Sequence, residues 1–222
     1  MSDQRTDDLI IIFDTTLRDG GQTRGVDFSA ADKQFIAQAL DDFGIDYIEG
    51  GWPGANPTDD MFFSKAQKLK NAKLVAFGMT RRGGRSVEND PGLNAILNAK
   101  TDATCLVGKT WDFHVTTALN IELDENLRMI TESVAAAKAR GHESMFDCEH
   151  YFDGYKANPD YALSCVQAAH QGGASWVILC DTNGGSLPDE VYEIVTATKK
   201  AYPDVRLGIC LLYTSPSPRD GL

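Results

Sequence analysis

The chain has 222 residues, of which 42% are hydrophobic and 24% charged, and a formal net charge of −11 at pH 7. This composition indicates a globular protein with a sizeable core, and the acidic balance argues against nucleic acid as a partner, because phosphate binding requires clustered lysine and arginine. The sequence shows no apolar run of the roughly 20 residues that cross a bilayer and no CxxC pair among its five cysteines, so we expect no membrane association and a reducing cytoplasm.

Short apolar runs recur along the chain with longer polar stretches between them. They are rich in Val, Ile and Phe and show little polar alternation, which is typical of strands buried on both faces of a parallel sheet. The predicted strands are residues 9–17, 45–52, 73–80, 102–110, 142–152, 175–185 and 205–210.

Helical patterns separate these strands. The first is predicted to begin after the N-cap Ser29 and to end at Gly44. It is expected to bury one apolar face, formed by Phe35, Ile36, Ala39, Leu40 and Phe43. The stretches 124–141, 158–173 and 187–203 repeat this design.

The repeated unit of strand, loop and helix indicates βαβ architecture. Seven strands in series, without a dinucleotide glycine fingerprint after the first, favour a TIM (β/α)₈ barrel over a doubly wound sheet. A complete barrel has eight strands and roughly 250 residues. We therefore expect an α/β fold that is an incomplete barrel of about seven strands, with strand 8 missing.

The active site of such a barrel lies at the carboxyl ends of its strands, and in this chain those ends are polar. The residues concerned are Asp14, Arg18, Asp19 and Gln22; Glu49; Arg81 and Arg82; Lys109 and Asp112; Asp147, Glu149 and His150; and Asp181, Thr182 and Asn183. Buried charges are tolerated only when they are paired or bound to a metal. This rim therefore predicts a site for a cation and an anionic substrate, with ordinary salt bridges as the alternative.

Four ordered motifs carry a family resemblance: FDTTLRDGGQ, IDYIEGGWPGANPTD, FDCEHYFDGYKANPDYAL and LCDTNGGSLPDE. Together they resemble the isopropylmalate and homocitrate synthase family, and within it the citramalate synthase branch, from Ile10 to about Ile209. The resemblance implies a metal-dependent Claisen-type condensation of acetyl-CoA with a small 2-oxo acid, pyruvate in this branch, in the biosynthesis of isoleucine. It also implies that the intact protein is a homodimer.

The same resemblance assigns the site residues. Asp19 would bind a divalent metal (Mg, Mn or Zn), Arg18 would stabilise the developing alkoxide, and Glu149 would act as an acid/base or acetyl-positioning group. The residues assigned to substrate binding are Gln22, Glu49, Thr182 and Asn183.

Several of these positions also have a structural interpretation. Asp14 is interpreted as a partner for its own loop, and Glu49 has the alternative role of orienting Arg18 through a charged hydrogen bond. Arg18 and Asp19 could form a simple ion pair.

Three further features are left outside the assigned site. On a strand, His150 would point away from its neighbour Glu149, so it is expected to support the residues of the site without contacting the metal or the substrate itself. Cys148 and Cys180 are expected to pack as small apolar groups. The basic loop 81–85, RRGGR, either meets the phosphates of CoA or is solvated.

The end of the chain departs from the family pattern. The family carries an H-x-H at the end of strand 7, which would complete the metal ligands, whereas this chain has Gly208, Ile209 and Cys210 there. The following segment, CLLYTSPSPRD, resembles the translation of a sequencing adaptor. We therefore expect residues 1–209 to be the catalytic barrel, residues 210–222 to be a non-native tail, and this exact chain to be inactive. A genuine Pro-rich terminus is the alternative.

Other functions stay open from the sequence. Within the family these are isopropylmalate synthase, homocitrate synthase and a hydroxymethylglutaryl-CoA lyase-like enzyme that cleaves carbon–carbon bonds. A non-catalytic, metal-free binding module is the alternative from a different class.

Overall fold

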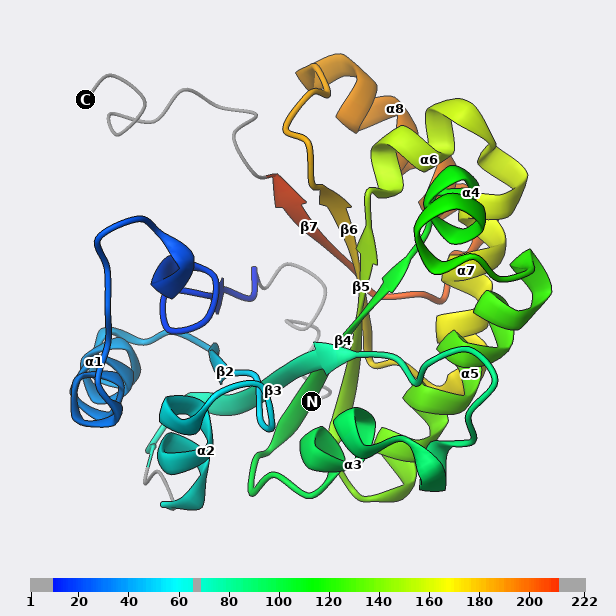
Figure 1. Cartoon of the computed structure of the whole chain (residues 1–222). Coiled ribbons are helices and arrows are strands. Elements are labelled where there is room, and N and C mark those ends of the chain that lie inside the picture. The colour runs from blue at the N-terminus through cyan, green and yellow to red at the C-terminus, as the bar shows by residue number, and fades with distance from the viewer. Residues whose placement is uncertain (1–9, 66–68, 212–222) are drawn as a thin grey trace, which may run out of the picture. The chain divides into compact units, whose positions relative to one another are not determined.

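The computed structural model describes residues 10–65 and 69–211, and the chain divides into two compact units. Unit 1 comprises residues 1–77 and 98–103, and unit 2 comprises residues 78–97 and 104–222. Figure 1 shows the alternation of strands and helices along the chain.

Unit 1 contains parallel strands followed by helices. Its elements are β1 (Phe13–Asp14), the short helix η1 (Gly20–Gln22), α1 (Ala30–Phe43), β2 (Tyr47–Gly51), α2 (Pro57–Ser64) and the greater part of β3 (Lys73–Met79). β2 pairs in parallel with both β1 and β3, and every residue of β2 is buried. The register between β2 and β3 shifts at Gly50, between Glu49 and Gly51, and such a bulge re-aims the neighbouring side chains.

Helix α1 has the predicted ends. The side chain of Ser29 accepts a hydrogen bond from the backbone N–H of Asp32, and the Asp32 carboxylate accepts one from the backbone N–H of Ser29. Gly44 closes the helix with a φ of 95°. The predicted buried face is wrong, however, because Phe35 and Phe43 are 77% and 82% exposed. The face that is buried carries Ala30, Lys33, Ala37 and Asp41.

The buried face of α1 tolerates charge because its polar groups have partners far away in the sequence. The Asp41 carboxylate accepts hydrogen bonds from the backbone N–H groups of Lys70, Asn71 and Ala72, at 2.7, 2.8 and 2.7 Å. Lys33 forms an ion pair with Asp59. Paired polar groups of this kind can replace apolar contacts in a core.

Unit 2 continues the alternation. Its strands are β4 (Ala103–Lys109, of which Ala103 belongs to unit 1), β5 (Glu143–Glu149), β6 (Trp176–Asp181) and β7 (Leu207–Leu211). They follow one another in chain order, and β6 pairs in parallel with β5 and β7. The helices are η2 (Val87–Asn89), α3 (Pro91–Leu97), α4 (Asp112–His114), the π-helix η3 (Val115–Leu119), α5 (Leu123–Ala139), α6 (Tyr151–Ala157), α7 (Pro159–Gly172) and α8 (Pro188–Ala201).

The helices of unit 2 pack closely against one another and against a turn of the backbone. α5 and α7 pack side by side along their length (Figure 1). At Gly154 of α6, a Cβ atom would lie 2.5 Å from the carbonyl oxygen of Thr110. Only glycine fits this contact between α6 and the turn after β4.

The fold class predicted from the sequence is confirmed, with seven strands that alternate with helices in the described part of the chain. Each predicted strand overlaps an observed one, although β1 is only two residues long. The predicted boundary after Ile209 falls inside β7, and residues 212–222 lie outside the described residues. Within the ranges described, no helix has the length and apolar character that a membrane span requires.

Candidate active site

A tight turn after β1 presents Arg18 and Asp19. The carbonyl oxygen of Thr15 accepts hydrogen bonds from the N–H groups of Arg18, Asp19 and Gly20, at 3.1, 2.9 and 3.1 Å. Asp14 accepts hydrogen bonds from the backbone N–H and the hydroxyl of Thr16, at 2.9 and 3.0 Å. Asp14 therefore holds its own loop, as the structural interpretation predicts.

Arg18 is fixed on several sides. Its Nε donates to Glu49 Oε2 at 2.6 Å, and its Nη1 donates to Asp19 Oδ1 at 3.1 Å. The guanidinium carbon also lies 3.9 Å from the centre of the Phe77 ring, a cation–π arrangement. The Glu49 side chain is completely buried, whereas 17% of the Arg18 side chain is exposed. This contact is the charged hydrogen bond on which the alternative role of Glu49, that of orienting Arg18, depends.

A pocket of about 400 Å³ lies in unit 1 beside this arginine. Two of the predicted site residues, Arg18 and Gln22, line it. The remaining lining residues are Leu17, Gly21, Asp27, Phe28, Lys33, Trp52, Ala55, Asn56, Thr58 and Asp59. The pocket thus combines an immobilised cation with an amide side chain and aromatic walls, which suits a small polar ligand.

Asp19 offers a carboxylate, a group that suits a divalent metal ion. Its side chain is 37% exposed, with one oxygen bonded to Arg18. Mg²⁺ or Ca²⁺ takes about six oxygen ligands, and all four histidines of the chain, at 114, 142, 150 and 170, belong to unit 2. Asp19 therefore fits as one ligand and does not by itself form a complete site.

In unit 2, Glu149 is the last residue of β5. Its Oε2 lies 2.6 Å from Lys109 Nζ, and a quarter of its side chain is exposed. Its carbonyl oxygen accepts hydrogen bonds from the N–H and the hydroxyl of Thr110, at 3.2 and 2.8 Å. The carboxylate is thus accessible and held by an ion pair.

The residues that follow β6 are tied to the start of α6. Thr182 Oγ1 accepts a hydrogen bond from the backbone N–H of His150 at 2.9 Å. Asp153 Oδ2 accepts one from Asn183 Nδ2 at 2.9 Å and lies 3.4 Å from His150 Nδ1. The structure therefore brings Thr182, Asn183 and the residue next to Glu149 together within unit 2.

The reason expected for the orientation of His150 is wrong. β5 ends at Glu149, and His150 has a left-handed backbone with a φ of 56°, so strand alternation does not apply to it. Its ring meets that of His114 edge to face, with 4.5 Å between the ring centres. Burial and the neighbouring His150 both lower the pKa of His114.

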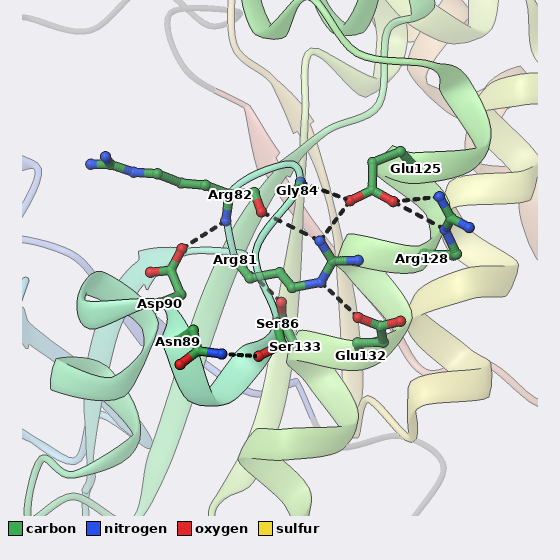
Figure 2. A network of polar contacts seen from close by, with 10 residues as sticks. All are labelled: Arg81, Arg82, Gly84, Ser86, Asn89, Asp90, Glu125, Arg128, Glu132 and Ser133. Atoms are coloured by element: carbon green, nitrogen blue, oxygen red, sulfur yellow. Dashed lines mark hydrogen bonds and ion pairs between the residues drawn. The ribbon is translucent and has the colours of Figure 1, made fainter.

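The basic loop 81–85 is tied to helix α5, as Figure 2 shows. Arg81 is only 4% exposed, and it donates to Glu132 Oε2 at 2.6 Å and to Glu125 Oε1 at 2.7 Å. Arg128 also bonds to Glu125, at 2.6 Å. The expectation of a solvated loop is therefore wrong for Arg81, although Arg82 is exposed.

The cysteines described as packing groups are confirmed. Cys148 and Cys180 are buried, as are Cys105 and Cys165. Burial raises the pKa of the Cys148 thiol well above its ordinary value, and it raises that of Cys165 to about 12. These thiols are poor nucleophiles.

Three polar residues beside the predicted positions were missed from the sequence: Lys33, Asp59 and Asp153. Lys33 lies on the same helical face as Ala37 and Asp41, a spacing that indicates which face it shares but not its partner Asp59. Asp153 lies one helical turn after His150, a spacing at which side chains meet.

The sequence is similar to those of known proteins. Residues 9–209 match the family model described as HMGL-like. The chain is 55% identical over 202 residues to the (R)-citramalate synthase of Aquifex aeolicus, covering 90% of this chain and 38% of that protein. It is 50% identical over 206 residues to the (R)-citramalate synthase of Streptomyces coelicolor, covering 91% of this chain and 38% of that protein. The 2-isopropylmalate synthase of a Bradyrhizobium strain is 32% identical over 202 residues, covering 90% of this chain and 37% of that protein.

Solved structures show the same fold. The HMG-CoA lyase of Bacillus subtilis superposes with a TM-score of 0.73 at 18% identity, covering 90% of this chain and 67% of that one. An HMG-CoA lyase from Acinetobacter baumannii, in complex with coenzyme A and 3-methylmalate, gives 0.71 at 18% identity, covering 90% and 66%. The chain spans well under half the length of the curated synthases that it matches. Because the family model matches residues 9–209, which is most of the sequence, the chain belongs to the HMGL-like family.

Proposed function

We propose that the protein to which this chain belongs condenses acetyl-CoA with pyruvate to form citramalate. The observation that carries the proposal is Arg18, which Glu49, Asp19 and Phe77 hold at the edge of a pocket of about 400 Å³. The choice of pyruvate is supported by 55% identity to a citramalate synthase, compared with 32% to an isopropylmalate synthase.

The reaction needs a fixed positive group. The methyl carbon of acetyl-CoA loses a proton and bonds to the carbonyl carbon of pyruvate, whose oxygen becomes an alkoxide and takes up a proton. Water then hydrolyses the thioester and releases CoA. A cation that is already in place lowers the barrier most when negative charge develops only in the transition state. We propose that Arg18 stabilises the alkoxide oxygen that forms on pyruvate. Glu49 acts through Arg18, because it is buried beneath it.

We assign supporting roles to the residues of unit 2. Glu149, held by Lys109, is the acid/base or acetyl-positioning group. Thr182 Oγ1 already accepts the N–H of His150, so its own hydroxyl proton can be donated to the carboxylate of the 2-oxo acid. Asn183 and, in unit 1, Gln22 complete the substrate contacts in this proposal.

The proposal includes a divalent cation, Mg, Mn or Zn, for which Asp19 supplies one oxygen ligand. When bound, such an ion acts as a Lewis acid on the carbonyl of the 2-oxo acid. We further propose that residues 1–209 are the catalytic region of a homodimeric, cytoplasmic protein. Light scattering on the full-length protein tests the dimer.

The experiment uses the full-length protein, because the chain spans about 38% of its citramalate synthase relatives. CoA release is measured with pyruvate, 2-oxoisovalerate and 2-oxoglutarate, and the product is identified by mass spectrometry. We expect the highest kcat/KM with pyruvate. A preference for another 2-oxo acid would move the protein to a different synthase, and cleavage of a hydroxyacyl-CoA without condensation would make it a lyase.

A matched pair of variants tests the role of Arg18. Arg18→Gln is expected to lower kcat by about 10²–10³-fold, the usual cost of losing a fixed group that stabilises a transition-state oxyanion. Arg24→Gln changes an exposed arginine of the same unit and is expected to leave kcat within twofold. Equal activity of the two variants would remove Arg18 from the mechanism.

A further inference from the structure

A buried ion pair lies at the wall of the pocket and has no part in the proposed chemistry. Lys33 of α1 and Asp59 of α2 pair with side chains that are only 7% and 8% exposed. Removing two charges from water costs several kcal/mol for each ion, and their attraction offsets this cost only when further hydrogen bonds satisfy both groups. We therefore ask which other groups Lys33 and Asp59 bind.

Both members of the pair bind one segment of the chain, residues 50–56, which comprises the end of β2 and the loop that follows it. Asp59 Oδ2 accepts hydrogen bonds from the N–H of Trp52 at 2.8 Å and from Asn56 Nδ2 at 2.9 Å. Lys33 Nζ donates to the carbonyl oxygen of Gly50 at 3.0 Å. Lys33 thus holds the end of β2, and Asp59 holds the loop between β2 and α2.

At Gly51 the backbone approaches the Asp59 carboxylate closely. Gly51 has a φ of 144°, and a Cβ atom there would lie 2.6 Å from the carboxylate of Asp59. Only glycine permits this approach. The loop and the carboxylate are therefore built to fit each other.

The loop carries this constraint to Arg18. The ring of Trp52 packs edge-on against Phe77, with 5.5 Å between the ring centres and an angle of 86°. The guanidinium of Arg18 lies on the Phe77 ring, 3.9 Å from its centre. Asp59 is thereby linked to Arg18 through Trp52 and Phe77, all within unit 1, and four of these residues, Arg18, Lys33, Trp52 and Asp59, line the same pocket.

We propose that Lys33 and Asp59 are positioning residues, which hold Trp52 against Phe77 and so keep the guanidinium of Arg18 in its catalytic place. The effect on turnover rests on the proposed function. The placement of Trp52 does not, and it can be measured in a protein with no activity at all.

Two double variants of the full-length protein separate positioning from folding. Both K33M/D59N and K33M/D59L leave no unpaired charge, so both are expected to fold. K33M/D59L should have the lower Tm, because it leaves the N–H of Trp52 without its acceptor, and every readout is therefore taken well below that Tm. The asparagine still offers an oxygen to the N–H of Trp52, whereas the leucine offers none. The control is Asp60→Asn, because Asp60 is an exposed neighbour that holds the outer side of the same loop through Gly54 N–H, at 2.7 Å.

The first readout is ¹⁹F NMR of protein labelled with 5-fluorotryptophan, with the Trp52 signal assigned by Trp52→Phe. We expect a wild-type Trp52 signal in K33M/D59N and in Asp60→Asn, and a shifted or broadened signal in K33M/D59L. The second readout is kcat, expected within threefold of wild type for K33M/D59N and about tenfold or more below it for K33M/D59L, since small misplacements of a catalytic group are costly.

Rescue by the variant that keeps the acceptor oxygen is a result that general loosening of the fold would not give. The same Trp52 signal in both double variants would overturn the proposal, and so would equal kcat values. If the full-length protein catalyses no condensation, the proposed function fails, and the fluorine signal alone decides whether the pair holds Trp52.

Discussion

Removing the charge of Glu125 should make unit 2 measurably less stable at neutral pH. Hydrogen bonds from Arg81 lower the pKa of Glu125 from its ordinary value of 4.5 to about 2, against the opposing effect of burial. This lowering by about 2.5 pH units corresponds to ~3.4 kcal/mol at most. Because 17% of the side chain is exposed, solvent screening reduces the expected loss in Glu125→Gln to about 2 kcal/mol.

The pH dependence gives the sharper test. A carboxyl group whose pKa is lowered by folding stabilises the native state above its unfolded pKa, and that stability disappears as the pH falls toward the folded value. The free energy of unfolding, from urea titrations followed by circular dichroism, should therefore differ between wild type and Glu125→Gln at pH 7. The difference should shrink between about pH 5 and pH 2, the window set by the two pKa values.

A difference that is the same at pH 7 and at pH 3 would refute this reasoning, because it would then come from packing and not from charge. Arg128→Gln serves as the control. Arg128 also bonds to Glu125, but its side chain is 66% exposed, and exposed ion pairs contribute only about 0–1 kcal/mol.

The structure supports two further predictions. Gly154→Ala should lower stability by about 1–3 kcal/mol through overpacking, since its Cβ would lie 2.5 Å from Thr110 O; thermal unfolding beside Gly185→Ala, where a Cβ meets nothing within 4 Å, checks this. The thiols of Cys148 and Cys165, whose pKa values burial raises, should react with Ellman's reagent only as the protein unfolds; rapid labelling of either in the native protein, located by peptide mass mapping, would contradict the described burial.

Local pattern predicted the strands well and the buried charges poorly. The run at 73–80 reads as a strand because nearly all of its residues are apolar, and β3 is indeed buried along its centre. The same logic failed for α1, where Phe35 was expected to be buried but is exposed, and the buried Lys33 was not expected. Lys33 is buried because of Asp59, 26 residues away, and no periodicity within one helix shows such a partner.

The site shows the same division. Motifs identified Arg18, Glu49 and Thr182, and the structure gives each a defined hydrogen-bond partner. What motifs do not show is which residues hold the site in place. Asp59 and Asp153 act through contacts that exist only once the loops have folded against their helices.

The left-handed backbone of His150 has a consequence for how this position can drift. Apart from glycine, asparagine, aspartate and histidine are the residues that best tolerate this conformation. A histidine codon becomes an asparagine or an aspartate codon by a single base change, whereas glycine requires two. Mutation therefore readily offers position 150 replacements that keep the turn and lose the imidazole, so a histidine that persists among descendant genes would be retained for its ring.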